Sequence, residues 1–364
     1  MRRILSLILS MIMLCTTLTG CASVKAQAAY TVYPVGYLTQ RLAGGLIKTE
    51  SIQEDTIVQR AQIRSDYEEI LKNSQVFLHI GNMEPYYSLY ADAITADVPE
   101  NMDLSSMNAV YDFQRYTPVL TDGVITYVES PYYRSDAFDL VDTDTKDLYL
   151  WTDPIAMLSM AKNIRDFLKT TYPDDVNAFD ANYTELENDL INLDAQYQAL
   201  SSSNEANNKV IRFVTMTASF GNWQKTYGFE VYPVILSKYG VLPNEQQLAV
   251  IEQRIQDDGV KYIVYEPNMT DDMKALFDRV QTDLNLTQVE LSNLSSLTQD
   301  DKDNGKDYLS LMYENLNVLQ TMVEDRPETV VSSDEIPQEE TVQEDGTDDN
   351  IQATMNPTDT RQEG

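Results

Sequence analysis

The chain has 364 residues, enough for two domains of ordinary size, and 43% of them are hydrophobic, so a packed core is expected. Its 58 acidic and 26 basic side chains give a formal net charge of −32, which excludes nucleic acid as a partner because such a surface repels phosphate. Both cysteines, Cys15 and Cys21, lie in the N-terminal segment, so the rest of the chain has no thiol for a disulfide or a zinc knot.

The N-terminal segment has the pattern of a secretory signal. Arg2 and Arg3 precede an apolar run over residues 4–18, which is short for a membrane-spanning helix. The run ends in a Leu-Thr-Gly-Cys sequence at Cys21, which resembles the lipobox of bacterial lipoproteins. By that resemblance residues 1–20 are a signal peptide, Cys21 carries the lipid, and residues 21–29 are a lipidated tether at the outer face of the bacterial cell membrane. An ordinary signal cleaved after residue 26 or 28 is the alternative.

Residues 30–175 are predicted to form an N-terminal α/β lobe. The pattern predicts a first strand over residues 31–35 and a helix over residues 38–46 that ends at a Gly-Gly pair. It further predicts a helix over residues 66–73, a buried parallel strand over residues 75–80 and a helix near residues 85–92. Such alternation of strands and helices is typical of an α/β fold with a parallel sheet.

The middle of the chain is predicted to be helical. Asp153 and Pro154 form a helix start, with an acidic N-cap and proline at the first helical position. A polar break over residues 172–175 ends this helix, and a longer amphipathic helix follows over residues 176–200.

Residues 201–323 are predicted to form a C-terminal α/β lobe. Strands are predicted over residues 210–216, 261–265 and 288–291, and helices over residues 244–257, from residue 271, and over residues 306–323. Residues 324–364 are rich in Glu, Asp, Thr, Gln and Pro and have few apolar side chains, so they are predicted to be a disordered acidic tail. A tail that gathers cations or binds a partner is the alternative.

Four stretches carry a family resemblance. They are residues 147–154 (DLYLWTDP), residues 217–223 (TASFGNW), residues 262–268 (YIVYEPN), and the set Tyr308, Met312, Asn315 and Leu316. In the same order they resemble the D-P-H-x-W-x-D-P, H-x-A-F-x-Y-F, F-x-E-P-Q and Y-x-x-x-M-x-x-N-L stretches of the TroA/ZnuA-like metal-binding lipoproteins of ABC importers. The resemblance covers about residues 30–323. It implies an α/β fold of two lobes, each with a small parallel sheet flanked by helices, joined by one long rigid helix over residues 176–200.

The resemblance also implies a metal site between the lobes, at the carboxyl ends of the strands. Its ligands are three His and a carboxylate, or two His and two carboxylates. Carried over to this chain, the ligand positions fall at Val58 or Gln59, Tyr149, Thr217 and Ser292, with an alternative Glu position near Val234. Hydroxyl groups are poor zinc ligands near neutral pH because they stay protonated, so no confident metal ligand is predicted. The only histidine, His79, falls in a predicted buried strand and is expected to be a core residue.

Three interpretations remain open. The first is a substrate-binding protein of a metal-type ABC importer that has changed its ligand, with Tyr149, Thr217 and Ser292 lining a cleft for a small organic molecule or a metal complex. The second is weak binding of a divalent metal, zinc or manganese, through the oxygens of Glu84 and Glu266. The third is an accessory or adhesin-like surface lipoprotein on the same fold, with no small ligand.

The expected partners follow from the resemblance. They are an ABC permease and its ATPase, together with the membrane through the lipid on Cys21, and the chain is expected to be a monomer. No cofactor is predicted beyond the divalent metal that the resemblance implies. An enzyme is not expected, because no nucleophile is paired with a histidine in the sequence.

Overall fold

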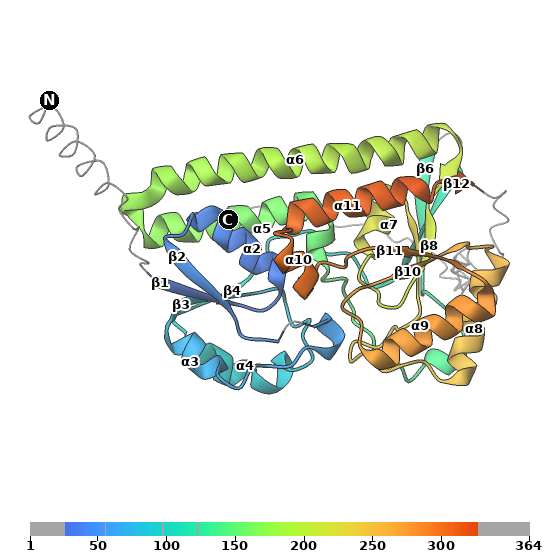
Figure 1. Cartoon of the computed structure of the whole chain (residues 1–364), viewed down its shortest axis with the longest axis horizontal. Coiled ribbons are helices and arrows are strands. Elements are labelled where there is room, and N and C mark those ends of the chain that lie inside the picture. Colours follow the sequence, from blue (N-terminus) through green and yellow to red (C-terminus); the bar gives the residue numbers. More distant parts are fainter. Residues whose placement is uncertain (1–25, 55, 97, 122–123, 327–364) are drawn as a thin grey trace, which may run out of the picture. The chain divides into compact units, whose positions relative to one another are not determined.

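Two parallel four-stranded sheets organise the chain in the computed structural model, which describes residues 26–54, 56–96, 98–121 and 124–326 (Figure 1). The first sheet has the order β2 (Ile47–Ser51), β1 (Ala26–Tyr30), β3 (Ser74–His79), β4 (Glu100–Asp103). The second sheet has the order β11 (Thr287–Glu290), β10 (Tyr262–Tyr265), β8 (Arg212–Thr215), β9 (Glu230–Pro233). Every pairing within the two sheets is parallel, which confirms the predicted α/β fold. We call the parts built on these sheets the first and the second lobe.

The first lobe begins with a strand where a tether was expected. β1 lies in the centre of the first sheet, and the small side chains of Ala28 and Ala29 are buried there. The prediction of a first strand over residues 31–35 was wrong. Helix α2 (Tyr33–Ala43) occupies that segment, because Pro34 lies in its first turn and favours helix, and the helix ends at Gly44 in the left-handed conformation.

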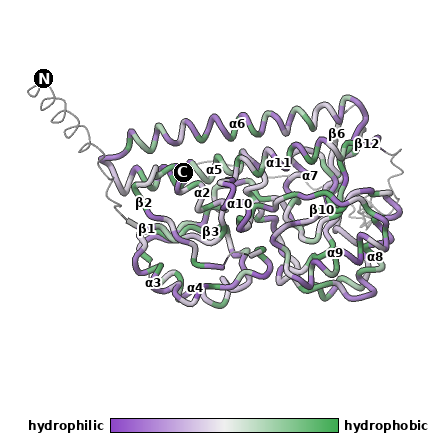
Figure 2. Tube along the Cα trace, viewed as in Figure 1, coloured by the Kyte–Doolittle hydropathy of each residue, from purple (hydrophilic) through white to green (hydrophobic). Residues whose placement is uncertain are grey.

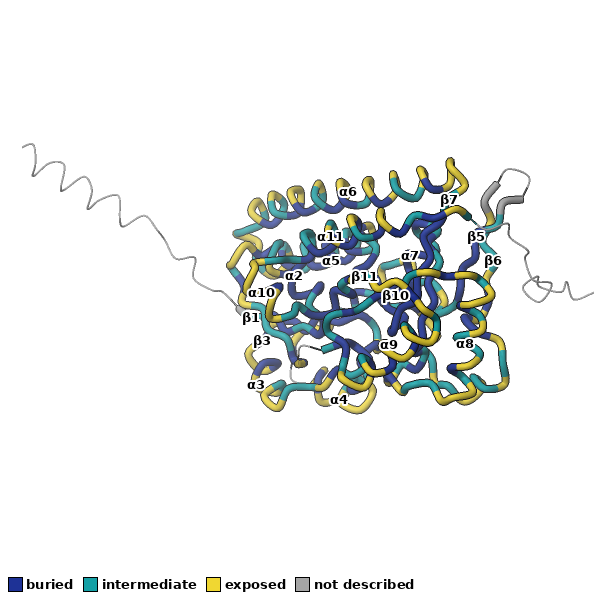
Figure 3. The backbone as a smooth tube through the Cα atoms, turned by 45° about the vertical axis from the view of Figure 1, so that its right-hand side comes forward, coloured by how far each residue is buried: buried dark blue, intermediate teal, exposed yellow. Residues whose placement is uncertain are grey.

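Two long helices lie side by side in the middle of the chain, and the longer one runs along both lobes (Figure 1). Helix α5 (Pro154–Thr171) begins as predicted at Asp153, whose Oδ1 accepts a hydrogen bond from the Ile155 amide at 2.8 Å. Helix α6 (Val176–Ala206) extends past the expected end at residue 200 and packs against α2, α5 and α11 (Tyr308–Thr321). Hydrophobic and hydrophilic residues alternate along α6 (Figure 2), and its buried residues face α5 and α11 (Figure 3).

The second lobe carries two additional antiparallel pairs. β5 (Arg115–Thr121) pairs with β6 (Val124–Ser130), and β7 (Lys209–Val210) pairs with β12 (Glu324–Asp325). Residues 324 and 325 therefore form a strand, which differs from the prediction of an acidic tail from residue 324 onward. The Glu324 carboxylate is nearly buried and forms ion pairs with Arg212 at 2.8 Å and Lys261 at 2.7 Å, which fixes the strand in place.

The shorter helices complete both lobes. They are α3 (Tyr67–Lys72), α4 (Tyr87–Ala96), α7 (Asn222–Tyr227), α8 (Glu245–Asp257), α9 (Asp271–Leu284), α10 (Gln299–Asp303), and the 3-10 helices η1 (Val58–Arg60), η2 (Asp136–Phe138), η3 (Leu150–Thr152) and η4 (Pro173–Asp175). The largest hydrophobic cluster joins residues of both sheets with α5, α6 and α11, so the lobes share one core. Within the residues that the structure describes, no helix is long and apolar enough to cross a membrane.

Candidate functional site

Glu266 anchors a buried polar cluster at the carboxyl end of β10. Its carboxylate accepts hydrogen bonds from the Thr217 amide at 3.0 Å, the Thr217 hydroxyl at 2.6 Å and the Asn293 side-chain amide at 2.8 Å. Burial raises the pKa of Glu266, and these donors oppose the shift. Each donor supplies a hydrogen to the carboxylate, so the arrangement fits the ionised side chain.

A row of hydroxyl groups leads from Glu266 toward Tyr149. The Thr217 hydroxyl lies 2.5 Å from the Ser219 hydroxyl, and because Thr217 donates its hydrogen to Glu266, Ser219 is the donor of this contact. Ser219 in turn interacts with the Tyr149 hydroxyl, and burial holds the pKa of Tyr149 well above its usual value. The structure therefore brings three of the sequence-predicted cleft residues together, namely Tyr149, Thr217 and Glu266.

Ser292 lies outside this cluster. Its backbone is bonded to the side-chain amide of Asn315, its hydroxyl accepts from the Leu294 amide at 3.2 Å, and it lines a separate hollow of about 590 Å³ beside α11. Its neighbour Asn293 reaches Glu266 instead, and Asn268 binds the oxygen of Asn293 at 3.1 Å. Sequence reasoning missed Asn293 because the carried-over position differs from it by one residue in a loop, where no periodicity fixes side-chain direction.

Glu84 occupies a different environment, in the loop after β3 of the first lobe. Its side chain is 1% exposed, and among the described residues neither carboxylate oxygen has a hydrogen-bond partner. The neighbouring Thr31 hydroxyl interacts with this carboxyl group, but not within the geometry of an ordinary hydrogen bond. Burial raises the pKa of Glu84 from its ordinary value to about 7.

His79 is a core residue, as predicted. It is 4% exposed and stacks on Phe77 and Tyr87, with ring centroids 5.3 and 4.8 Å away. Its Nδ1 atom lies 2.7 Å from the carbonyl oxygen of Gly81, and burial lowers its pKa. The imidazole therefore packs and forms its hydrogen bond within the first lobe.

The remaining predicted ligand positions are also filled by neutral, buried side chains. Val58 and Gln59 lie in η1 and Val234 follows β9, each less than a tenth exposed. Over the described residues, no group of three or more His, Cys, Asp or Glu side chains is arranged to hold a metal ion. Cys21 lies outside the described residues.

Comparison with known sequences identifies the family of this chain. The family described as zinc-uptake complex component A, periplasmic, matches residues 29–322. The chain belongs to this family. Its two-lobe fold and the four stretches noted in the sequence agree with that membership.

Curated relatives match about half of the chain. The zinc-binding protein AdcA of Streptococcus pyogenes is 29% identical over 177 residues, which are 48% of this chain and 32% of AdcA. The high-affinity zinc uptake system protein ZnuA of Bacillus subtilis is 24% identical over 173 residues, 48% of this chain and 52% of ZnuA. The match thus spans about a third to a half of the length of these relatives.

Solved structures share the fold at lower identity. Zinc-bound AdcA of Streptococcus pneumoniae aligns with a TM-score of 0.60 and 20% identity, covering 82% of this chain and 57% of AdcA. The periplasmic zinc-binding protein TroA of Treponema pallidum aligns with a TM-score of 0.62 and 16% identity, covering 82% of this chain and 99% of TroA. These alignments support two lobes joined by a long helix.

Proposed function

We propose that this protein is the extracytoplasmic substrate-binding receptor of an ABC importer in the zinc and manganese class, and that its metal site has been replaced. Family membership and the two-lobe fold support the receptor role. One observation supports the replacement: the Thr217 hydroxyl, at a position where the family resemblance implies a histidine, donates to Glu266 and so closes the site with an internal hydrogen bond.

The proposed mechanism is capture between the lobes followed by delivery to a permease and its ATPase. α6 contacts α2 and α5 of the first lobe and β7 and α7 of the second, so it couples the two lobes along one rigid element. Small movements of the lobes are therefore expected rather than wide opening. We infer no catalytic role, and we propose that the receptor acts as a monomer.

Native mass spectrometry with elemental analysis tests the proposed replacement of the metal site. The form used is residues 22–364, purified from the host without chelators. We expect an organic molecule or a metal complex to co-purify with it. Stoichiometric zinc or manganese that survives dialysis would contradict the replacement. Crosslinking in host membranes tests the receptor role separately: an ABC permease should be the crosslinked partner, and its absence would overturn that role.

An adhesin-like role is the second candidate. The neutral side chains at every carried-over ligand position favour it, because the described residues then hold no group of His, Cys, Asp or Glu arranged for a metal ion. A structural neighbour from Streptococcus agalactiae, 16% identical, is described as a bifunctional protein with adhesin and metal transporting activity. If no small molecule or metal co-purifies and no permease crosslinks, this role replaces the receptor role.

We further propose that the lipid on Cys21 holds the protein at the membrane. Cleavage after residue 26 or 28, the alternative, would remove part of the central strand β1, whereas cleavage before Cys21 leaves the strand intact. The variant Cys21→Ser should therefore appear in the soluble fraction with its fold unchanged. If it remains with the membranes after a high-salt wash, the lipobox interpretation is wrong.

A further inference from the structure

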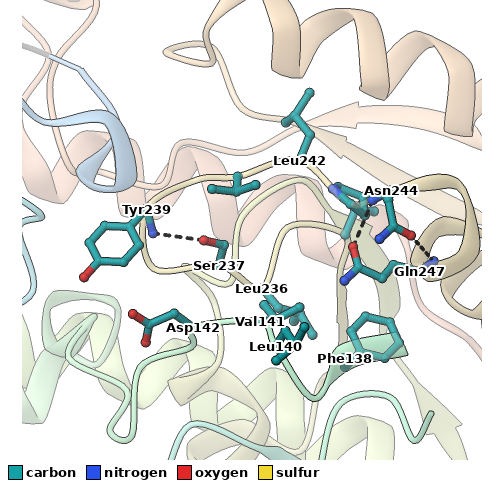
Figure 4. A pocket seen from close by; sticks show the side chains of 13 residues that line it. Phe138, Leu140, Val141, Asp142, Leu236, Ser237, Tyr239, Leu242, Asn244 and Gln247 are labelled. Atoms are coloured by element: carbon teal, nitrogen blue, oxygen red, sulfur yellow. Dashed lines mark hydrogen bonds between the residues drawn. The ribbon is translucent and has the colours of Figure 1, made fainter. Parts of the chain in front are cut away.

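An apolar pocket of about 340 Å³ lies in the second lobe, between residues 138–142 and 234–247 (Figure 4). Its lining is mainly aliphatic and aromatic, and Figure 4 shows Leu236, Val141 and Leu140 between Asp142 and Tyr239 on one side and Phe138 and Gln247 on the other. This volume falls in the range of small-molecule sites in proteins, roughly 300–1,000 Å³.

The rim of this pocket leaves apolar surface uncovered. Leu140 is 97% exposed, Val241 62% and Tyr239 42%, and these belong to the few large apolar side chains that are exposed in the described part of the chain. Exposed apolar side chains gathered around an apolar hollow mark a binding site more strongly than the same side chains scattered singly. The floor is buried, as Val234 shows with 1% exposure.

The pocket lies where an α/β sheet places its ligands. Val234 directly follows β9, and its amide donates to the Thr215 carbonyl of β8 at 2.9 Å, so the pocket adjoins the carboxyl ends of these strands. The same residue marks the position near which the family resemblance implies a carboxylate ligand. An apolar wall therefore stands where a metal-binding side chain was expected.

The pocket also lies beside the contact between the lobes. A Cβ atom at Gly240 would lie 3.1 Å from Gln59 Cβ and 3.0 Å from Arg60 Nε, so the loop that carries Tyr239 and Val241 touches η1 of the first lobe. A molecule in the pocket would thus contact a loop of the second lobe that also touches the first lobe.

The charged and amide side chains that line the pocket already have partners. Asp142 forms an ion pair with Lys238 at 2.9 Å, and Asn244 and Gln247 bond reciprocally in the capping box of α8. The pocket offers a ligand no unpaired charge from these groups, and the net charge of −32 repels anions. We propose that the pocket binds the apolar or aromatic body of an uncharged small organic molecule. This proposal rests on the receptor function above and names the class of its substrate.

A fluorescence titration tests the pocket. Residues 22–364 are titrated with N-phenyl-1-naphthylamine, an uncharged aromatic probe, and with the anionic probe 8-anilinonaphthalene-1-sulfonate. We expect saturable 1:1 binding of the uncharged probe and at least tenfold weaker binding of the anion. The variants Leu140→Glu and Val241→Glu change exposed positions and are therefore compatible with folding. Each should bind the uncharged probe at least tenfold more weakly than the wild type does. Leu89→Glu on α4, where the leucine is 82% exposed, is the matched control and should leave binding unchanged.

Three outcomes would overturn the pocket proposal. They are equal binding of the uncharged probe by Leu140→Glu, Val241→Glu and the control, binding that does not saturate, and a wild-type dimer in sedimentation that Leu140→Glu dissociates, which would assign the rim to a second copy of the chain. Failure of the receptor function gives a different result, since probe binding would persist while no permease crosslinks. A co-purified organic mass that is present in the wild type and absent from Leu140→Glu would support both.

Discussion

Two buried glutamates, Glu266 and Glu84, occupy comparable places in the two lobes. Each follows a strand that lies in the interior of its four-stranded sheet, β10 for Glu266 and β3 for Glu84, and each side chain is at most 1% exposed. Their surroundings differ: Glu266 receives three hydrogen bonds, whereas the Glu84 carboxylate has no hydrogen bond of ordinary geometry among the described residues and only a weaker interaction with Thr31. Position in the fold therefore does not decide what a buried carboxyl group does, and the donors around it do.

The buried carboxyl groups of the two lobes therefore have different roles. In the second lobe, the Glu266 carboxylate accepts internal hydrogen bonds that join the loops after β8, β10 and β11. This group is therefore not available to a ligand. The first lobe keeps a carboxyl group whose pKa burial raises to about 7, so that it binds a proton through most of the acidic range. Only the Glu266 oxygens are engaged by internal hydrogen bonds, whereas the Glu84 carboxyl group is neutral below about pH 7 and a weak metal ligand in that range.

The largest expected effect follows from removing the charge of Glu266. In Glu266→Gln the side-chain amide must face a donor that now points at the carboxylate, and the free energy of unfolding should fall by about 3 kcal/mol. Urea unfolding followed by the emission of the buried Trp151 and Trp223 measures the change. Glu290→Gln, at an exposed position of β11, is the control and should change stability by less than about 0.5 kcal/mol. A loss in Glu266→Gln as small as in this control would mean that the cluster is not a structural clasp.

An effect of comparable size and opposite sign is expected at Glu84. Its pKa in the folded chain, about 7, exceeds the ordinary 4.5, so its contribution to stability is present below about pH 4.5 and is lost as the pH rises to about 7. Glu84→Gln stays neutral at every pH. At pH 8 it should be more stable than the wild type by about 3 kcal/mol, and at pH 4.5 nearly equally stable. The measurement is urea unfolding at both pH values.

The control for the Glu84 variant is Glu69→Gln, at an exposed position on α3. It should give the same difference from the wild type at pH 4.5 and at pH 8. If Glu84→Gln is less stable than the wild type at pH 8, the carboxylate has a partner that stabilises its charge, and the contrast with Glu266 does not hold.

The strongly patterned helices and strands could be predicted from the sequence. The helix start at Asp153, the apolar stripe of α6 and the buried run of β3 each carry a local signal, a cap or a periodicity, that tertiary packing reinforces. β1 was missed because its alanine residues have low strand propensity, and its place in the sheet comes from pairing with β2 and β3.

The candidate site was predictable only in part. Thr217 and Glu266 each follow a predicted strand, but they were candidates under two different interpretations, and their direct contact was not predicted. The pocket around Val234 could not be predicted in this way, because residues 138–142 and 234–243 lie far apart in the chain. Neither segment has a hydrophobic periodicity that would indicate the lining of a pocket. Whether two loops meet is decided by tertiary packing, which a single sequence does not display.

The smallest expected effect concerns the contact between the lobes themselves. Arg60 of η1 and Asp272 of α9 form an ion pair at 2.9 Å, with 35% and 49% of their side chains exposed. Because solvent screens such a pair, a double-mutant cycle with Arg60→Gln and Asp272→Asn should give a coupling energy of about 0.5 kcal/mol at low salt and close to zero in 1 M NaCl. The same cycle on Lys162 and Asp166, an exposed pair within α5, is the control and should behave alike. A coupling between Arg60 and Asp272 that is several-fold larger, or that persists in high salt, would show that this pair helps to hold the lobes in one arrangement, and the contrast between the lobes would then include how firmly they are joined.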